Sequence, residues 1–313
     1  MAEKVKSCCA VTRQRENLQP IETKEVSAVN RVHLEGMIYL EGGEFLMGTD
    51  SDEAIQADGE GPVRKVQVQP FYIDPCTVTN EQFRKFVSDT GYKTEAESYG
   101  DSFVFHHFVS AETKPRVKQV VQGAPWWWVV EGANWRNPEG VDSTIDDRMD
   151  HPVVHISWND AMAFCKWAGK RLPTEVEWEY AARGGLIQKI YPWGDELTPN
   201  GVHQCNIWQG EFPEKNDALD GYLGTAPANS FPANQFGLYN MAGNVWEWCA
   251  DWFSVGSQHP GVNNLSKGSA KVIRGGSYLC HQSYCNRYRV AARTFNTADS
   301  STGHIGFRCV ADS

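Results

Sequence analysis

Apolar residues alternate with polar ones early in the chain and recur at helical spacing further on, so strands and then helices are expected. The stretch 37–48 is apolar and punctuated by glycine, and the stretch 65–69 alternates between polar side chains and valine. Alternation places one face of a segment against a core and the other in water, which is typical of a half-buried strand. We therefore expect antiparallel strands in both stretches.

Three helices are predicted from their start and stop signals. A Ser or Thr before the first turn caps its amide groups, and an acidic residue three positions on can complete a capping box. Ser157 with Asp160 has this spacing, as does Thr174 with Glu177. The predicted helices follow Thr79 up to Gly91, follow Ser157 through Ala168, and follow Thr174 up to Gly184.

The rest of the chain is expected to complete one domain with little regular secondary structure. The stretches 95–150 and 190–270 are rich in Gly, Asn and Trp, and so many Trp side chains argue against disorder. No repeat and no composition break marks a second domain. We assign residues 33–313 to one folded domain, and we expect the polar residues 1–32, with Cys8 and Cys9, to be a disordered tail.

The charge and hydropathy of the chain narrow its partners. The 39 acidic and 29 basic residues give a net charge of −10, which opposes binding to nucleic acid or to anionic lipid. Apolar runs such as 126–130 are too short to span a bilayer, and residues 1–17 contain no signal-peptide core. We expect a cytoplasmic protein with no nucleic-acid or membrane partner.

Cys280 and Cys285 are the sharpest candidates for chemistry among the nine cysteines. Five positions apart, their thiols can meet only through a turn, and the glycines at 275 and 276 make a tight loop feasible. The pair could form a structural disulfide, remain two unrelated thiols, or hold a soft metal such as Cu(I). Zinc fits poorly, because only His281 lies between them. Three arginines nearby would favour thiolates if they face the pair: Arg287, Arg289 and Arg293.

Other polar residues have metal-like spacing with a plainer explanation. His151 and His155 are expected in a strand, which would place them about 13 Å apart, too far to share an ion. Oxygen-bearing side chains at Asn206, Asp217 and Asp220, and in the stretch 240–247, suit calcium but also suit turns and caps. The acidic stretch 50–58 is expected to be a solvated turn.

A set of motifs identifies a family. They occupy residues 151–160, 167–175, 191–194, 237–248, 274–277 and 306–308. Together they closely resemble the formylglycine-generating enzyme, or sulfatase-modifying factor, family over about residues 36–311. The pattern Ser-Tyr-x-Cys-His-x-Ser-Tyr-Cys-x-Arg-Tyr-Arg at 277–289, followed by Asn-Thr-x-Asp-Ser-Ser at 296–301, is specific to this enzyme within the wider superfamily.

The resemblance implies a single α+β domain, distantly like C-type lectins and with little regular secondary structure, and it implies an oxidase activity. Such an enzyme converts the cysteine of a Cys-x-Pro-x-Arg segment in an unfolded sulfatase to formylglycine, with O₂ and a thiol reductant. Cys280 and Cys285 would hold Cu(I), and the substrate thiol would join them. Trp246 and Ser277 resemble the residues that shape the copper and oxygen site.

The resemblance also implies two calcium sites and one disulfide. The first calcium set is Asn206, Ile207, Asp220 and Tyr222, and the second is Asn240, Gly243, Val245 and Glu247. Cys165 and Cys309 match a family disulfide, whereas Ala182 and Val290 replace a second pair found in animal members.

Two rival functions share this fold. The sulfoxide synthases of ergothioneine biosynthesis take iron ligands from an additional helical domain, which the polar residues 1–32 cannot supply. Lectin-like binding modules without enzymatic activity typically lack the two active thiols, whereas this chain has both.

Overall fold

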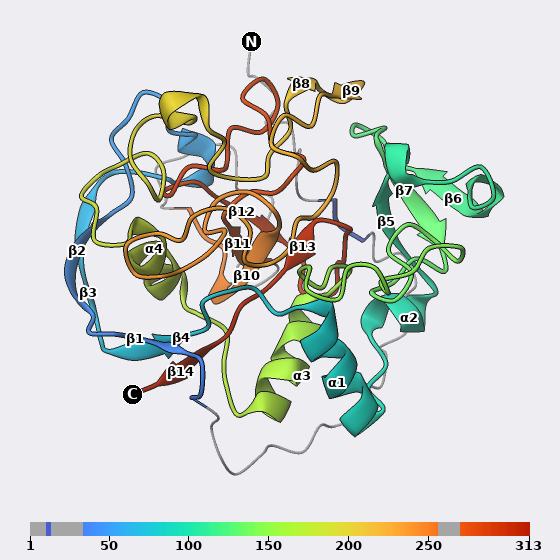
Figure 1. Ribbon diagram of the computed structural model, residues 1–313, viewed down its shortest axis with the longest axis horizontal. Coiled ribbons are helices and arrows are strands. Elements are labelled where there is room, and N and C mark those ends of the chain that lie inside the picture. The colour runs from blue at the N-terminus through green and yellow to red at the C-terminus, as the bar shows by residue number, and fades with distance from the viewer. Residues whose placement is uncertain (1–10, 14–33, 256–269) are drawn as a thin grey trace.

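A small central sheet organises the computed structural model, which describes residues 11–13, 34–255 and 270–313 (Figure 1). Its strand order is β12-β11-β10-β13. The strands are β10 (Trp246–Trp252), β11 (Lys271–Arg274), β12 (Arg293–Asn296) and β13 (Ile305–Gly306). β11 is antiparallel to both neighbours, whereas β13 is parallel to β10. The long connection between β11 and β12 leaves the end of this sheet, and it contains both candidate thiols.

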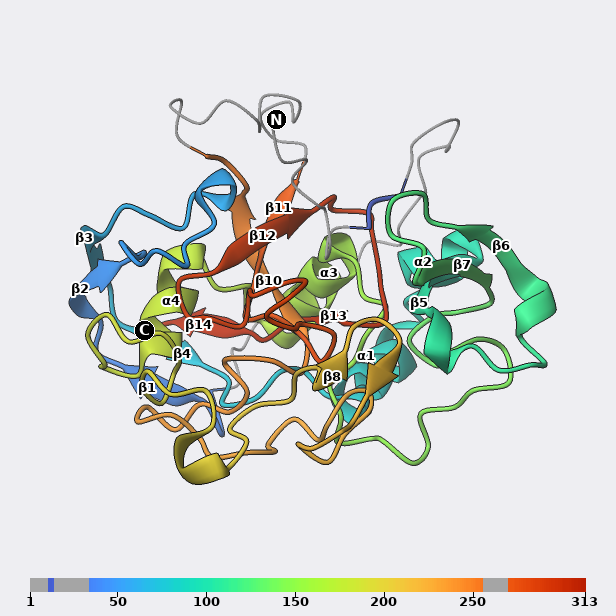
Figure 2. The ribbon, with the colours of Figure 1, turned by 90° about the horizontal axis from the view of Figure 1, so that it is seen from above.

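Smaller sheets surround the centre. Two of them have three strands: one is formed by β1 (Ile38–Leu40), β4 (Phe71–Ile73) and β14 (Val310–Asp312), and the other by β5 (Asp101–Phe105), β7 (Trp127–Glu131) and β6 (Val117–Val120). Two have two strands: β2 (Gly43–Met47) pairs with β3 (Arg64–Val68), and β8 (Gly210–Glu211) pairs with β9 (Lys215–Asn216). β2 and β3 pair antiparallel, which confirms the strands expected from the early alternation. The β5–β7 sheet and the β2–β3 pair lie on opposite sides of the central sheet (Figure 2).

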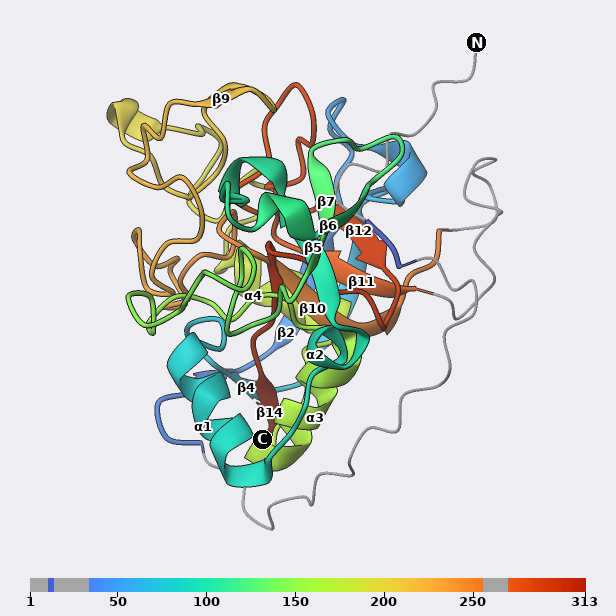
Figure 3. The same ribbon diagram turned by 90° about the vertical axis from the view of Figure 1, so that its right-hand side faces the viewer.

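The three predicted helices are confirmed. They are α1 (Asn80–Thr90), α3 (Trp158–Ala168) and α4 (Glu175–Arg183), and each begins with a complete capping box and ends at a glycine of positive φ. α1 packs against α3 (Figure 3), while α4 contacts the strands β10 and β11. Short 3₁₀ turns occur at Gln56–Asp58, His106–Phe108, Lys114–Arg116 and Pro199–Gly201.

Three expectations differ from the structure. The stretch 95–150, expected to be irregular, contains α2 (Glu95–Tyr99) and the β5–β7 sheet. The segment 151–155 is no strand, because only Pro152 makes an isolated bridge and His155 has a φ of 59°. A disordered tail was expected over residues 1–32, but residues 11–13 are packed against the domain. The other residues of that tail lie outside the described part of the chain.

The largest hydrophobic cluster joins the helices to the thiol loop. Phe83, Phe86 and Phe164 from α1 and α3 share it with Trp246 and Trp248 from β10. Cys280 and Cys285 belong to the same cluster, so the pair is part of the main core. Among the described residues, no helix has both the length and the apolar character needed to cross a bilayer.

Candidate active site

The two candidate thiols meet. The Sγ atoms of Cys280 and Cys285 are 3.3 Å apart, and the side chains are 0% and 1% exposed. A turn brings them together, because the amide groups of Tyr284 and Cys285 both donate to the carbonyl oxygen of His281. The predicted turn is therefore confirmed, and the two sulfur atoms form one buried site of soft donors.

A close backbone approach at Gly276 fixes the start of this loop. Gly276 has a φ of 76°, and a Cβ there would lie 3.0 Å from the carbonyl oxygen of Arg287 and from the Cα of Tyr288. Glycine is the residue that tolerates both conditions. The segment that follows β11 and the segment that precedes β12 are therefore in close backbone contact on either side of the thiol turn.

Ser277 lies next to Cys280, and Trp246 belongs to the same hydrophobic cluster as both thiols. The amide of Ser277 is 3.4 Å and its hydroxyl 4.0 Å from the Cys280 Sγ. Trp246 is completely buried in the cluster that contains both thiols, and its indole Nε1 has no hydrogen-bond partner. A buried N–H without a partner is costly, so this indole is suited to a group that enters the site from outside.

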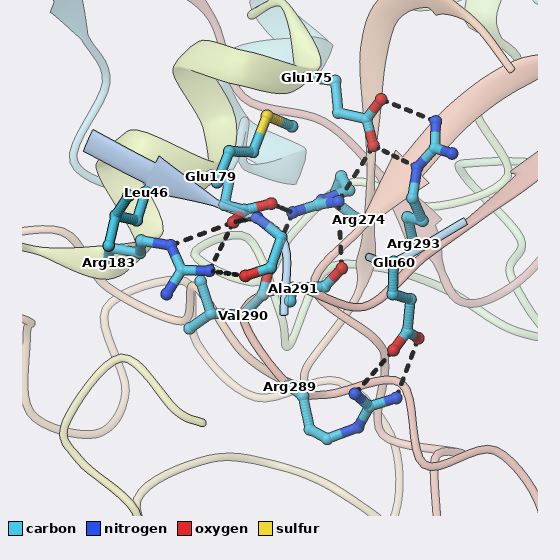
Figure 4. A network of polar contacts seen from close by, with 12 residues as sticks. Leu46, Glu60, Glu175, Glu179, Arg183, Arg274, Arg289, Val290, Ala291 and Arg293 are labelled. Carbon is cyan, nitrogen blue, oxygen red and sulfur yellow. Dashed lines mark hydrogen bonds and ion pairs between the residues drawn. The ribbon is translucent and has the colours of Figure 1, made fainter. Parts of the chain in front are cut away.

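A buried ion network ties both ends of the thiol loop to α4 (Figure 4). At the start of the loop, the Arg274 guanidinium is 3.0 Å from a Glu175 oxygen and 2.5 Å from a Glu179 oxygen. At its far end, Arg293 pairs with Glu175 at 2.6 Å. Arg183 shares Glu179 with Arg274. Nearby positive charges hold the pKa of Glu175 below its usual value despite burial, so this carboxylate remains charged.

The acidic loop before β3 contributes a second set of buried partners. Asp58 Oδ2 is 2.6 Å from Arg287 Nε, and the Glu60 carboxylate is held by Arg289 at 2.8 and 2.9 Å. The expectation of a solvated turn over 50–58 is thus wrong for Asp58, which is only 4% exposed because it neutralises a buried guanidinium. Burial raises the pKa of Glu60, and its contacts with Arg289 oppose that shift.

Only one of the three arginines near the pair contacts a thiol. Arg287 Nη1 is 3.9 Å from the Cys285 Sγ. Arg289 and Arg293 instead direct their guanidinium groups to Glu60 and Glu175. Of these three arginines, Arg287 is therefore the one beside a thiol, whereas the other two stabilise the loop through their carboxylate partners.

Aromatic rings flank Cys285 on the outer side, and the sequence motifs did not identify them. Tyr284 stacks on Phe212 with ring centroids 4.0 Å apart, and Trp126 meets both rings edge-on at 4.9 and 5.4 Å. All three rings are partly exposed. The Trp run at 126–128 was the available signal, but nothing in the sequence placed it beside residue 285. Such a surface suits an apolar segment of a bound polypeptide.

The first predicted calcium set is brought together. Asp220 Oδ2 accepts from the amide of Ile207 at 3.0 Å, and its other oxygen accepts from the amide of Tyr222 at 3.0 Å. Asn206 is fully buried, and its Oδ1 has no partner. The Gln209 amide group donates to both Asp220 Oδ2 and the carbonyl oxygen of Ile207. An unpartnered buried oxygen beside a carboxylate suits a hard cation, so this donor set fits calcium.

The second predicted set fits calcium less well. Asn240 Oδ1 is buried without a partner, as in the first set. The Glu247 carboxylate, however, is engaged through both oxygens by Arg308 at 2.7 Å and receives a further bond from the Trp178 indole at 2.8 Å. Because Arg308 already neutralises this carboxylate, the case for a cation at Asn240, Gly243, Val245 and Glu247 is weaker. Among the described residues, no cluster of three His, Cys, Asp or Glu side chains forms a metal site.

The other sequence-derived pairs are also located. The sulfur atoms of Cys165 and Cys309 are 3.6 Å apart and unbonded, so the expected proximity is confirmed. Ala182 and Val290 pack in one buried cluster. His151 contacts Thr225, while His155 is enclosed by Ser102 and the carbonyl oxygen of Pro138, which leaves neither histidine in a shared site.

Comparison with known proteins places the whole domain. Residues 22–313 match the model of the sulfatase-modifying factor enzyme 1-like domain. A formylglycine-generating enzyme from Thermomonospora curvata is 59% identical over 284 residues, covering 88% of this chain and 93% of the relative. The "Inactive C-alpha-formylglycine-generating enzyme 2" of Bos taurus is 48% identical, over 87% of both chains.

A solved structure supports the α+β architecture. PvdO from Pseudomonas aeruginosa superposes with a TM-score of 0.63 at 26% identity, covering 88% of this chain and 94% of that one. The extent of the domain match and the identity to curated relatives exceed what a shared fold alone would give. The chain belongs to the sulfatase-modifying factor enzyme 1-like family.

Proposed function

We propose that this protein is a copper-dependent oxidase that converts the cysteine of a Cys-x-Pro-x-Arg segment in a sulfatase to formylglycine. The observation that carries the proposal is the thiol pair, with two buried sulfur atoms 3.3 Å apart. Two soft sulfur ligands suit Cu(I) better than zinc or a hard cation. The names of the relatives support the generation of formylglycine, and the description of the family supports a sulfatase as the protein that is modified.

The residues of the chain divide the work around that pair. Cys280 and Cys285 hold the metal, which supplies the electron transfer to O₂ that thiols alone perform poorly. Ser277 and Trp246 form the inner wall of the site, and Tyr284 lies against the substrate at its mouth. In net balance the substrate cysteine gives two electrons to O₂ and two reductant thiols give the other two. The products are the aldehyde, hydrogen sulfide from the substrate sulfur, one water molecule and the disulfide of the reductant.

Replacement of the two thiols tests this function. In the Cys280→Ser and Cys285→Ser variants a hard, protonated hydroxyl replaces a soft thiolate, so we expect loss of copper binding and of peptide conversion. Mass spectrometry of a Cys-x-Pro-x-Arg peptide, incubated with copper-loaded protein, O₂ and a thiol reductant, reports the conversion. Both thiols lie in the main core, so circular dichroism must show that each variant is folded.

Cys205 provides a matched control. It is a buried thiol of the same hydrophobic cluster but is not one of the two thiols that we propose hold copper. The Cys205→Ser variant should therefore retain copper and activity. If folded Cys280→Ser and Cys285→Ser variants convert the peptide at the wild-type rate, the oxidase proposal is wrong. A binding module without enzymatic activity would then be the better explanation, and the name of one relative shows that the family includes an inactive member.

We further propose structural calcium at Asn206, Ile207, Asp220 and Tyr222. The unpartnered Asn206 oxygen and the nearby carboxylate of Asp220 support it. In the structure the Gln209 amide group bonds to the Asp220 carboxylate and to the Ile207 carbonyl oxygen, and calcium would replace it there. Because calcium would bind only the native state, its binding is measurable as a gain in stability.

A further inference from the structure

Residues 11–13 occupy a groove of the folded domain. In Figures 1 and 2 this short blue stretch lies between the central sheet and the β5–β7 sheet. Val11 is only 4% exposed. Its cluster comprises Phe103, Phe105, Ala124, Trp127, Trp208, Tyr278 and Leu279. An apolar side chain from outside the domain therefore fills a pocket that the domain provides.

Arg13 is held by charge and by an aromatic ring. Its Nη1 is 2.5 Å from Asp101 Oδ1, and its Nη2 donates to the carbonyl oxygen of Asp101 at 2.8 Å. The guanidinium lies 4.2 Å from the ring centroid of Tyr99. Both partners of the ion pair are largely buried, with side chains 10% and 12% exposed. Lys118 contacts the other oxygen of Asp101 at 3.0 Å.

The backbone of the same stretch is also captured. The Asn296 side-chain amide donates to the carbonyl oxygen of Val11 at 3.3 Å, and the amide of Arg13 donates to Ser300 Oγ at 2.9 Å. Contacts to the backbone and to two side chains, two positions apart, are the usual way in which a groove recognises an extended peptide.

This groove adjoins the thiol pair. Leu279, which packs in the Val11 cluster, is next to Cys280 in the chain. Trp208 packs in the same cluster, and its amide donates to the carbonyl oxygen of Cys280 at 3.0 Å.

The sequence of this stretch resembles the substrate motif. Residues 9–13 read Cys-Ala-Val-Thr-Arg, which matches Cys-x-Pro-x-Arg at the cysteine and the arginine, with valine at the proline position. Valine and proline are apolar and of similar size. The pocket around Val11 and the carboxylate of Asp101 therefore have the spacing that a Pro-x-Arg segment requires.

We propose that residues 11–13 are an internal mimic of the Pro-x-Arg part of the substrate, which occupies the substrate groove in cis and competes with the sulfatase segment. This inference rests on the proposed function, because it takes the substrate motif from there. A tethered segment has a high effective concentration, and a groove filled in about 90% of molecules would weaken the apparent affinity for substrate about tenfold.

Opposite effects at the two ends of one ion pair test the mimic. The probe is a fluorescent Ser-x-Pro-x-Arg peptide titrated against the metal-free full-length protein, so that no turnover is involved. Arg13→Ala should release the internal segment and lower the peptide Kd about tenfold. Asp101→Asn should raise the Kd, because the substrate arginine loses its carboxylate.

Two further variants keep the test decisive. Val11→Ala should also tighten peptide binding, since it weakens the internal segment without touching Asp101. Arg15→Ala, at an arginine outside the five-residue pattern, should leave the Kd unchanged. A synthetic peptide with the sequence of residues 7–17 should displace the fluorescent peptide from the Arg13→Ala variant.

The outcomes separate the two proposals. If the Kd of Arg13→Ala and Val11→Ala equals that of the wild type, or if Arg13→Ala and Asp101→Asn shift it in the same direction, the stretch is only a structural strap and the mimic is refuted. If no variant binds the peptide, including Arg13→Ala, the proposed function itself fails and the mimic fails with it.

Discussion

Asp58 shows how one residue far away in the sequence supports the thiol site. It lies 229 positions before Arg287, yet their side chains are 2.6 Å apart and both are buried. Arg287 in turn places Nη1 3.9 Å from the Cys285 Sγ. Desolvating two charges is expensive, so such a pair fixes geometry more than it adds stability, and breaking it from one side is costly.

We predict that Asp58→Asn destabilises the fold strongly. Removing the charge leaves the Arg287 guanidinium buried without its carboxylate, which typically costs about 3–5 kcal/mol of unfolding free energy. Urea unfolding measures the change. Asp52→Asn, at an exposed acid of the same loop, is the matched control and should change stability by less than about 0.5 kcal/mol. Equal effects in the two variants would show that the buried pair has no special role.

His155 is predicted to limit stability at acid pH. It is completely buried, its Nε2–H donates to the carbonyl oxygen of Pro138 at 2.7 Å, and burial lowers its pKa to about 4. The unfolded chain binds this proton near pH 6.5, so stability is full above that value and falls as the pH drops towards 4. The loss reaches about 3 kcal/mol.

A histidine variant isolates this contribution. His155→Gln cannot take up the proton, so its loss of stability between pH 6.5 and 4 should be smaller than that of the wild type, as urea midpoints across this range would show. Asp160 has the opposite effect on the pH dependence of stability, because burial raises its pKa to about 7. Since the wild type and the His155→Gln variant both contain Asp160, its effect cancels in the comparison. Parallel pH profiles would contradict the prediction.

At the scale of elements, helices could be predicted from local sequence signals, whereas strands could not be predicted reliably because they depend on pairing with distant segments. Capping boxes at Ser157 and Thr174 predicted two helices, and their physics is contained within four consecutive residues. The same box at Thr94 and Glu97 begins α2, which was missed because the helix has only 5 residues and no apolar period. The segment 151–155 was wrongly assigned as a strand, since its β-branched residues are buried on all sides without a partner strand.

The loop between β11 and β12 gives a prediction about close packing. Gly276 and Gly100 have the same φ of 76°, but a Cβ at Gly100 would meet nothing within 4 Å, whereas one at Gly276 would meet backbone at 3.0 Å. Gly100→Ala should therefore cost only the conformational strain of a left-handed alanine, about 1 kcal/mol. Gly276→Ala should cost clearly more and should also lower copper affinity by displacing the thiol loop.

Urea unfolding and copper titration of both variants separate the two effects. Strain alone would give Gly276→Ala and Gly100→Ala equal losses of stability, with copper binding unchanged in both. That result would mean that the approach of residues 287 and 288 to Gly276 does not determine the geometry of the pair.

At the scale of the whole molecule, the site is assembled from segments that no local pattern links. The spacing of Cys280 and Cys285 allowed the two thiols to meet through a local turn, and the family motif around them predicted that they act as a pair. Asp58, Glu60 and the groove that holds residues 11–13 could not be predicted, since burial and pairing across more than 200 positions depend on the complete fold. The disordered tail expected at 1–32 failed at 11–13 for the same reason.

Calcium binding is predicted to act on this whole-molecule scale. The first calcium set joins the segment around Asn206 to the loop that contains Asp220, and neither segment has regular secondary structure of its own. A ligand that binds only the native state stabilises it by mass action, about 2.7 kcal/mol at a hundredfold excess over Kd. Addition of calcium to chelator-treated protein should therefore raise the melting temperature.

Variants of the two sets tell which one binds. Asp220→Asn should abolish the calcium-dependent rise, because it removes the charge of the first set while keeping a side chain of the same shape. Glu247→Gln should destabilise the protein with and without calcium, since it breaks the buried pair with Arg308. If the rise persists in Asp220→Asn but disappears in Glu247→Gln, the second set is the calcium site, and the Arg308 pair must open to admit the ion.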